Sequence, residues 1–506
     1  MRIRLPILLL AAASSLSACG SGGGGPLSGS SDISASALQA AVRDPDVRRF
    51  YQANGWQAVW NKDLTKQLTE AIHLAPKHAL LPDMFMPKAL PEDPAQRETA
   101  LTKAALAYGQ ALAFGRTDPG KTTEVYTLPR PKVDLAKGLT QAATDKKIGE
   151  WLDGLAPQTD EYRALSKAFL HYAQLAASGP EQDIAAGKPI KPGATDARIV
   201  PLVEALKANG YLPVNASLSS SRPQYAPAIA QAVKAMQADF GLKPDGVVGP
   251  DTLQILNTGA VERARQIAVN MERRRWLSHD LPATRIDVNT AATFLEYWRD
   301  GQLKNRRNVV VGQPDWETPQ LGSPMFQLVA HPTWTVPDSI AEEELAGKGA
   351  GYFASQNITM RNGKYVQMPG PKNALGEVKF DLKNDQAIYL HDTPARALFT
   401  ANERHRSHGC VRVQDALGFA RMIAQDDGIL EQFDAAYRDK PDDVSYVPMK
   451  TQIPVRLLYH TVFLDADGQL SFRTDVYGWD NDVAVALGRP QATRHKLRRQ
   501  SGDIGP

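Results

Sequence analysis

The chain has 506 residues, of which 43% are hydrophobic and 22% charged, and its formal net charge is +3. This charge is too small to indicate a polyanionic partner such as nucleic acid. At roughly 150 residues per domain, the length allows about three domains, each able to bury a core.

The N-terminus has the anatomy of a secretory signal. Arg2 and Arg4 precede an apolar run over residues 5–13, too short to span a bilayer, and small residues follow up to Cys19. Residues 16–19, Leu-Ser-Ala-Cys, resemble the bacterial lipobox, in which the cysteine is lipidated and starts the mature chain. An ordinary signal peptide with a chance cysteine is the alternative. We expect a lipoprotein signal peptide over 1–18, lipidation at Cys19 and a Gly/Ser tether over 19–35.

Residues 36–185 are rich in alanine and leucine at helical spacing, so we expect a helical scaffold there. A compact unit follows at 196–258. Apolar residues recur at i, i+3, i+4 and i+7 from Ile199 to Leu206, and a second such run covers 229–240. Asp245-Gly246 predicts a turn, and Pro250 fits the first turn of a third helix. These signals predict a three-helix module.

A connecting helix is expected over 262–281, followed by a mixed, mainly β domain over 282–480 and a basic tail over 481–506. The helix holds five arginines, which indicate either a nucleic-acid surface or a solvated or salt-bridged face: Arg263, Arg265, Arg273, Arg274 and Arg275. Asp300-Gly301 predicts a turn between two β-rich runs. Further strands are expected at 326–330, 387–390 and 454–463, whereas 411–413 fits a strand or the start of a helix. The predicted fold class is multidomain α+β.

Cys410 is the one cysteine left if Cys19 carries a lipid. In an exported protein, an odd cysteine indicates an intermolecular disulfide or a thiol kept free for its chemistry, with a buried structural cysteine as the alternative. A thiol needs a nearby base to become a nucleophile near neutral pH. The candidate bases are His391, His405 and His408, and Gly409 would let a substrate carbonyl approach the backbone.

A zinc site is the rival interpretation, because these three histidines and Cys410 could surround a metal. The segment lacks a paired ligand signature such as CxxC or HExxH. We therefore expect an enzyme without metal or cofactor.

Two families resemble parts of this chain. The module over 196–258 is similar to the peptidoglycan-binding domain in Gly210-Tyr211-Leu212, Gln237 and the run Asp245 to Pro250. Ser407-His408-Gly409-Cys410-Val411-Arg412, with His391 upstream, resembles the signature of the L,D-transpeptidase catalytic domain, also called YkuD. Other stretches resemble its large YcbB-type branch: 270–276, 332–337, 370–376 and 477–480.

The resemblance implies a mechanism and a site. Cys410 would attack the bond before the terminal D-alanine of a tetrapeptide stem, and an amine of a neighbouring stem would resolve the thioester into a 3-3 cross-link. His391 would be the general base, and His408 and Gly409 would form the oxyanion region. A carbapenem would acylate Cys410, and residues 338–385 would form a capping subdomain. The implied substrate-binding residues are Arg412, Tyr389, Trp334, Ser407 and Asn373.

Two other functions stay open at this stage. Water could resolve the thioester, which would make the protein an L,D-carboxypeptidase, or the protein could be a non-catalytic wall-binding lipoprotein. The expected partners are peptidoglycan stem peptides and glycan strands, and the membrane through the lipid anchor, but not nucleic acid. The expected location is the periplasmic side of the cell envelope. The resemblance to bacterial lipoproteins, with Gly20 rather than aspartate after Cys19, implies sorting to the outer membrane.

Overall fold

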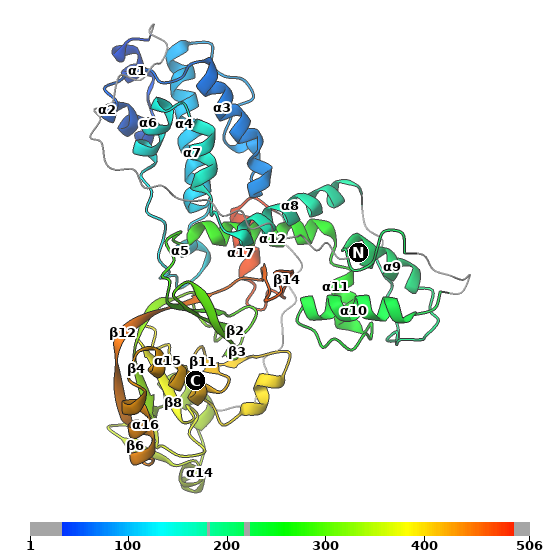
Figure 1. Ribbon diagram of the computed structural model, residues 1–506, viewed down its shortest axis with the longest axis vertical. Coiled ribbons are helices and arrows are strands. Elements are labelled where there is room, and N and C mark those ends of the chain that lie inside the picture. The colour runs from blue at the N-terminus through cyan, green and yellow to red at the C-terminus, as the bar shows by residue number, and fades with distance from the viewer. Residues whose placement is uncertain (1–32, 180–182, 217–222, 490–506) are drawn as a thin grey trace.

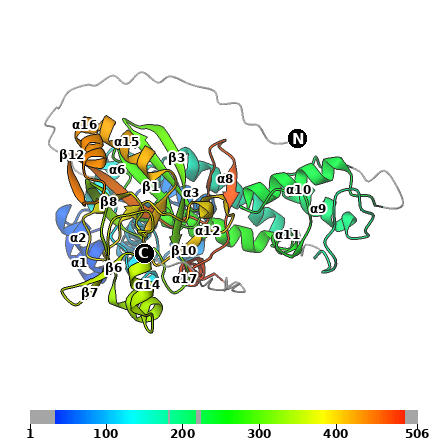
Figure 2. The same ribbon diagram turned by 90° about the horizontal axis from the view of Figure 1, so that it is seen from below.

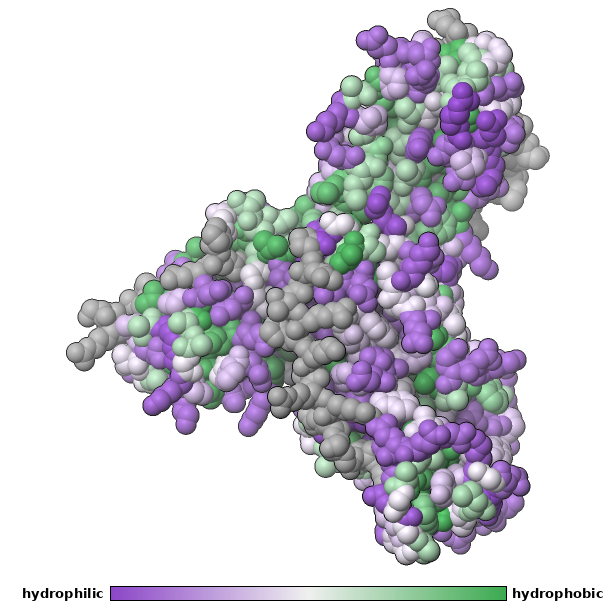
Figure 3. All heavy atoms as spheres, turned by 180° about the vertical axis from the view of Figure 1, so that it is seen from behind, coloured by the Kyte–Doolittle hydropathy of each residue, from purple (hydrophilic) through white to green (hydrophobic). Residues whose placement is uncertain are grey.

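The computed structural model describes residues 33–179, 183–216 and 223–489. Three parts meet at one central helix: a helical region, a three-helix module and a β domain (Figure 1). Seen from below, the module projects away from the other two parts (Figure 2), and from behind the three parts are separate lobes (Figure 3). The expected signal peptide, Cys19 and most of the tether lie outside the described residues.

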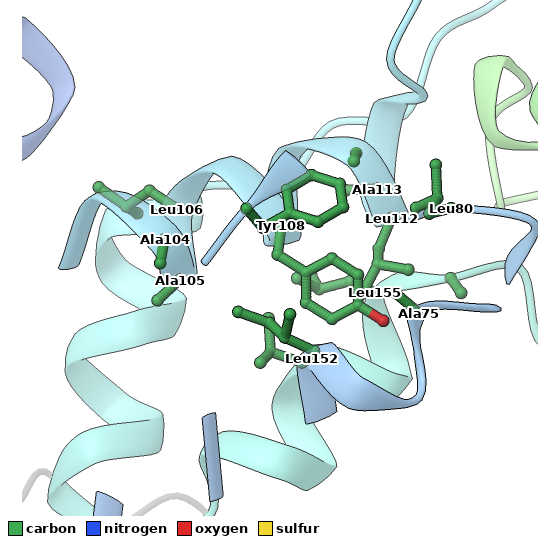
Figure 4. Close-up of a cluster of buried hydrophobic side chains, with 14 of the residues drawn as sticks. Ala75, Leu80, Ala104, Ala105, Leu106, Tyr108, Leu112, Ala113, Leu152 and Leu155 are labelled. Carbon is green, nitrogen blue, oxygen red and sulfur yellow. The ribbon is translucent and has the colours of Figure 1, made fainter. Parts of the chain in front are cut away.

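The helical region is built around α4, which is buried along most of its length. Side-chain caps at Asp44, Asn61, Asp93 and Thr159 begin four of its helices. Tyr108 and Leu112 of α4 pack with Leu152 and Leu155 of α7 in the core (Figure 4). The helices are α1 (Ala35–Ala41), α2 (Pro45–Ala53), α3 (Lys62–His73), α4 (Pro94–Phe114), α5 (Pro119–Thr122), α6 (Leu135–Thr144), α7 (Ile148–Leu155) and α8 (Asp160–Ala177), with short 3-10 turns at Ala75–His78 and Pro82–Met84.

The predicted three-helix module is present as α9 (Ile199–Ala208), α10 (Pro227–Asp239) and α11 (Pro250–Leu256). Gln237 is buried and fixes the turn between α10 and α11. Its amide oxygen accepts from the Gly246 N–H at 2.8 Å, and its amide nitrogen donates to the Val247 carbonyl at 3.0 Å. Gly246 has φ +75°, a left-handed conformation that favours glycine.

The central helix is α12 (Ala260–Trp276), and its arginines are buried rather than solvated. Arg265 and Arg275 pair with carboxylates of α12 itself, and the others reach neighbouring parts of the molecule. Arg274 pairs with Glu161 of α8 at 2.8 Å, and Arg263 lies over the Phe240 ring at 4.6 Å. The expected solvated or salt-bridged face is therefore a salt-bridged one, because four of the five arginines pair with a carboxylate and all five are buried.

Glu272 of α12 joins the helical region to this hub. Its carboxylate is fully buried and accepts from the backbone N–H groups of Arg116 at 2.6 Å and Thr117 at 2.7 Å. It also accepts from Arg275 at 2.6 Å, and Arg275 donates in turn to the Tyr162 hydroxyl at 2.8 Å. A single carboxylate thus links α12 to the end of α4 and to α8.

The expected basic tail over 481–506 is wrong at its start. Residues Trp479–Ala486 form helix α17, which packs on α12. Asp480 is fully buried and ion-paired with Arg273, and Val483 and Ala484 pack against Val269 and Trp276. Asp480 gives Arg273 a buried partner, so this segment belongs to the core. Residues 490–506 lie outside the described part of the chain.

The β domain is a mixed sheet that closes on itself. The strand order is β10-β3-β11-β9-β8-β4-β12-β1-β2, and β2 also pairs with β3. The 411–413 segment is a strand, and Asp300 and Gly301, with φ +51° and +79°, form the predicted turn between β2 and β3. The strands are β1 (Arg285–Asn289), β2 (Phe294–Arg299), β3 (Gln302–Gly312), β4 (Gly322–Ala330), β8 (Val378–Leu382), β9 (Leu390–His391), β10 (His405–Ser407), β11 (Val411–Val413) and β12 (Ser445–Leu458).

Helices α15 (Ala416–Asp426) and α16 (Leu430–Asp439) cover this sheet, and hairpin β13 (Val462–Leu464) with β14 (Leu470–Phe472) follows it. A smaller subdomain packs around Trp334, Ile340 and Leu345. The subdomain was expected to cover residues 338–385, but it ends before β8, because β8 is a strand of the main sheet. Its elements are β5 (Trp334–Thr335), α13 (Asp338–Ile340), a π-helical turn (Ala341–Leu345), α14 (Ala350–Ser355), β6 (Ile358–Arg361) and β7 (Lys364–Gln367).

We predict that Glu272→Gln destabilises the protein by about 3–5 kcal/mol, because it leaves Arg275 buried without a charged partner and turns an amide toward backbone donors. Chemical denaturation measures this loss. The control is Glu150→Gln, whose carboxylate pairs with Lys147 on the surface and whose side chain is 72% exposed. Equal stability of the two variants would contradict a structural role for Glu272.

Candidate functional site

Five polar side chains share one face of the sheet around Cys410. In the parallel β9–β11 pair, His391 lies opposite Arg412, and the Val411 N–H donates to the Tyr389 carbonyl at 3.1 Å. In the antiparallel β8–β9 pair, Lys379 lies opposite His391. Because side chains alternate along a strand, Lys379, Tyr389, His391, Cys410 and Arg412 all point to the same side.

Cys410 is buried, with 4% of its surface exposed, and its thiol lies 3.8 Å from the Ala387 carbonyl oxygen. Burial raises the pKa of the Cys410 thiol to about 11, against the opposing effects of the Tyr389 backbone N–H and the Lys379 charge. The thiol is therefore almost wholly protonated near neutral pH. It needs a base at the moment of reaction.

His391 is fully buried at the end of β9. Its ring contacts the Tyr389 ring, with the centroids 5.6 Å apart. The register puts His391 diagonally across from Cys410, which corresponds to roughly 8 Å between their Cβ atoms. An imidazole side chain can span most of that distance, so His391 is suitably located to accept a proton from the thiol.

The loop before Cys410 is held by its own side chains and by a threonine from elsewhere. The Ser407 hydroxyl donates to the Cys410 carbonyl at 2.6 Å, and the Gly409 N–H donates to Ser407 Oγ at 3.2 Å. Gly409 has φ +107°, so a side chain here would strain the backbone. The Thr318 hydroxyl donates to the Gly409 carbonyl at 2.8 Å. The loop conformation is therefore fixed from both sides.

His408 reaches the smaller subdomain. Its Nε2 lies 3.2 Å from Glu344 Oε1 on the π-helical turn, and its ring contacts the Trp316 ring edge-on, with centroids 4.9 Å apart. The subdomain thus contacts the Cys410 loop through the Glu344–His408 pair. His405 lies elsewhere: its ring nitrogens contact the Glu403 carboxylate and, at 3.0 Å, the Thr290 carbonyl.

Of the remaining predicted site residues, Tyr389 is half-buried and the others are buried. Tyr389 packs against the subdomain core that contains Trp334. The Asn373 amide nitrogen donates to the carbonyls of Pro332 at 2.9 Å and Met368 at 3.0 Å. Arg412 is 1% exposed. Asn373 and Ser407 therefore hold backbone, and substrate binding by either one stays a prediction.

The metal-site alternative lacks a matching geometry. Within residues 33–179, 183–216 and 223–489, no group of three His, Cys, Asp or Glu side chains is arranged to hold a metal ion. In the same part of the chain, no helix is long and apolar enough to cross a membrane.

Lys379, Thr318 and Glu344 lie at this site but were not predicted from the sequence. Lys379 reaches the site because β8 pairs with β9. Such a pairing between separate strands cannot be predicted from local sequence periodicity. Its ammonium lies 4.3 Å from the centre of the Tyr389 ring. Thr318 and Glu344 reach the Cys410 loop from segments about 91 and 64 residues away in the chain, as the numbering shows.

Comparison with known proteins identifies three regions. Residues 283–448 match the model of the L,D-transpeptidase catalytic domain, YkuD, residues 195–256 match that of a peptidoglycan-binding domain, and residues 45–169 match that of a scaffold domain. A Haemophilus influenzae protein that bears the name L,D-transpeptidase is 29% identical over 224 residues, which are 40% of this chain and 45% of that protein. The match thus spans less than half of the relative's length.

Solved structures were also found. An L,D-transpeptidase fragment from Xylanimonas cellulosilytica is 16% identical, with 54% of this chain and 98% of that chain covered and a TM-score of 0.16. An L,D-transpeptidase from Mycobacterium smegmatis is 13% identical. The match covers 34% of this chain and 58% of that chain, with a TM-score of 0.19. With TM-scores this low, the assignment depends on the sequence matches. Those matches show that residues 283–448 are similar to the YkuD L,D-transpeptidase catalytic domain and residues 195–256 to a peptidoglycan-binding domain.

Proposed function

We propose that the protein forms 3-3 cross-links in peptidoglycan, through a thioester between Cys410 and a tetrapeptide donor stem. The observation that carries this proposal is the shared sheet face, on which a buried thiol lies beside a histidine and two cationic side chains. Such a face can lower the cost of forming a thiolate and hold an anionic peptide. The catalytic-domain match over 283–448 supports the same reaction class.

In the first proposed step, His391 accepts the thiol proton as the sulfur attacks the carbonyl carbon before the terminal D-alanine. The C–N bond breaks, D-alanine leaves with the proton from His391, and a thioester remains. In the second step, the side-chain amine of a neighbouring stem attacks the thioester. Its proton passes to His391 and then to the sulfur, which restores the thiol.

Other residues would support these steps. Backbone N–H groups of the 408–410 loop would stabilise the oxyanion, a contribution of several kcal/mol in comparable sites. The Gly409 N–H is engaged with Ser407 Oγ at 3.2 Å, so it would have to turn from this partner to contribute. Arg412 would bind a stem carboxylate, and Tyr389 and Trp334 would line the donor groove under the smaller subdomain.

The peptidoglycan-related domains indicate a cell-envelope protein. We further propose that Cys19 is lipidated and anchors the protein on the periplasmic side of the outer membrane.

The reaction is tested by incubating the purified chain without its signal segment with tetrapeptide muropeptides and identifying the products by mass. We expect free D-alanine and a cross-linked dimer. A tripeptide alone would indicate an L,D-carboxypeptidase instead, and unchanged substrate would favour a binding role. Cys410→Ala is the control and should release no D-alanine.

The histidines can be separated by carbapenem acylation followed by mass. We predict that His391→Ala lowers the acylation rate about 10²–10⁴-fold, to near the level of Cys410→Ala, because base and nucleophile act as one unit. His408→Ala should keep measurable acylation, and His405→Ala should change little.

The pH dependence gives a further check on the same variants. Burial raises the pKa of Cys410 to about 11, so the residual acylation of His391→Ala should increase with pH toward that value, as hydroxide replaces the missing base. Fast acylation of His391→Ala at neutral pH, together with none in His408→Ala, would reverse the assignment.

For the anchor, we predict that Cys19→Ala releases the protein from the membrane fraction, because the lipid is its only proposed attachment. Fractionation and the mass of the mature N-terminus measure this. A variant that stays membrane-bound with the same mature N-terminus would contradict lipidation at Cys19.

A further inference from the structure

A second polar pocket lies away from the thiol, at the junction of the β domain and hairpin β13–β14. Its volume is about 440 Å³, and its lining includes four arginines and two aromatic rings: Arg306, Arg307, Arg404, Arg473, Phe294 and Phe463. Gln414 also lines it, at the far end of β11 from Cys410. Four residues of extended chain correspond to roughly 13 Å, so the pocket is separate from the nucleophile.

Among the residues that line this pocket, four arginines face one carboxylate, Asp465. Arg306 pairs with Glu296 at 3.4 Å, and Arg307 pairs with Asp415 at 2.8 Å. In the described part of the chain, Arg404 and Arg473 have no carboxylate within ion-pair distance.

These two arginines bind backbone carbonyls instead. Arg404 donates to Val309, Ala401 and Thr293, and Arg473 donates to Asp239 and Phe472. Asp465 is the carboxylate in the lining, and its Oδ1 already accepts from the N–H groups of Asp467 and Gln469.

The electrostatics of Arg473 reflect the same imbalance. Burial, together with the nearby Arg404 and Arg306 charges, lowers the pKa of Arg473 to about 10. A bound anion would offset this repulsion between neighbouring guanidinium groups.

The wall of the pocket is attached to the three-helix module. Arg473 donates to the Asp239 carbonyl at the end of α10 at 2.6 Å, and Phe472 stacks on Phe240 with ring centroids 5.2 Å apart. A Cβ at Gly241 would lie 2.9 Å from Arg473 Nε, so this position needs a residue without a side chain. The pocket is therefore directly connected to the module that resembles a peptidoglycan-binding domain.

The lining suits a carboxylate on a peptide. Guanidinium groups bind carboxylates through paired hydrogen bonds, and the Arg306 guanidinium lies over the Phe294 ring at 3.9 Å. Peptidoglycan stems carry several free carboxylates. We propose that this pocket binds the carboxylates of an acidic stem peptide on the strand held by the neighbouring module, a site distinct from the donor groove. This assignment rests on the proposed function.

The test compares two matched arginines in the full mature chain carrying Cys410→Ala, so that no turnover occurs. Arg306 and Arg421 each have one carboxylate partner and one aromatic neighbour, but Arg421 pairs with Asp434 outside the pocket. The probe is a disaccharide tetrapeptide, and calorimetry gives its Kd. We expect Arg306→Gln to weaken binding about tenfold and Arg421→Gln to leave the Kd within about twofold. Thermal unfolding checks that both variants are folded.

Equal Kd values for the two variants would overturn the proposal. The proposal would also be overturned if Arg306→Gln weakened the binding of inorganic phosphate but not that of the muropeptide. The pocket would then be a general anion site. In chains that keep Cys410, Arg306→Gln should raise KM and leave kcat unchanged. If the wild-type chain releases no D-alanine while Arg306→Gln still weakens muropeptide binding, the proposed reaction fails and the pocket assignment stands.

Discussion

The buried carboxylate of Glu272 is the interaction on which the arrangement of the whole molecule depends. A charge taken out of water is tolerated only when donors surround it, and Glu272 has donors from α12 itself and from the chain after α4. The same helix binds α8 through Arg274, α17 through Arg273 and the three-helix module through Arg263. Through these contacts a single helix helps to position α8, α17 and the three-helix module relative to one another.

Charge is used differently at the active-site face. There burial keeps the thiol neutral, and Lys379, His391 and Arg412 lie on the same side of the sheet as the sulfur. A buried, protonated thiol is protected from adventitious reaction. In the proposed reaction it would become a nucleophile only when a substrate brings its carbonyl to the sulfur and the proton moves to His391.

Much of this could be read from the sequence, because the signals were local. The three-helix module followed from apolar periodicity and the Asp245-Gly246 turn, and the Cys410 motif followed from adjacent residues. The tail was predicted wrongly because Asp480 is held by Arg273, about 207 positions earlier, and no local pattern records that pairing. Lys379, Thr318 and Glu344 were missed for the same reason: each reaches the site by long-range pairing or packing. The 411–413 segment was ambiguous because three residues are too few to distinguish a strand from a helix start.

The closed sheet has a consequence for how the chain acquires its structure. Strand β1 pairs with β12, so Ile286 needs Val455 as its partner, and the ring cannot close until nearly all of the domain is available. Contacts between such distant residues require a loss of chain entropy before the contacts themselves contribute favourable free energy. Domains with many such contacts therefore fold slowly. While the chain emerges from a ribosome or a membrane pore, the β domain would stay extended long after the helical region has packed. The sheet can then close only after β12 has been made or transported. A domain that stays unfolded until that point can still pass through a narrow channel.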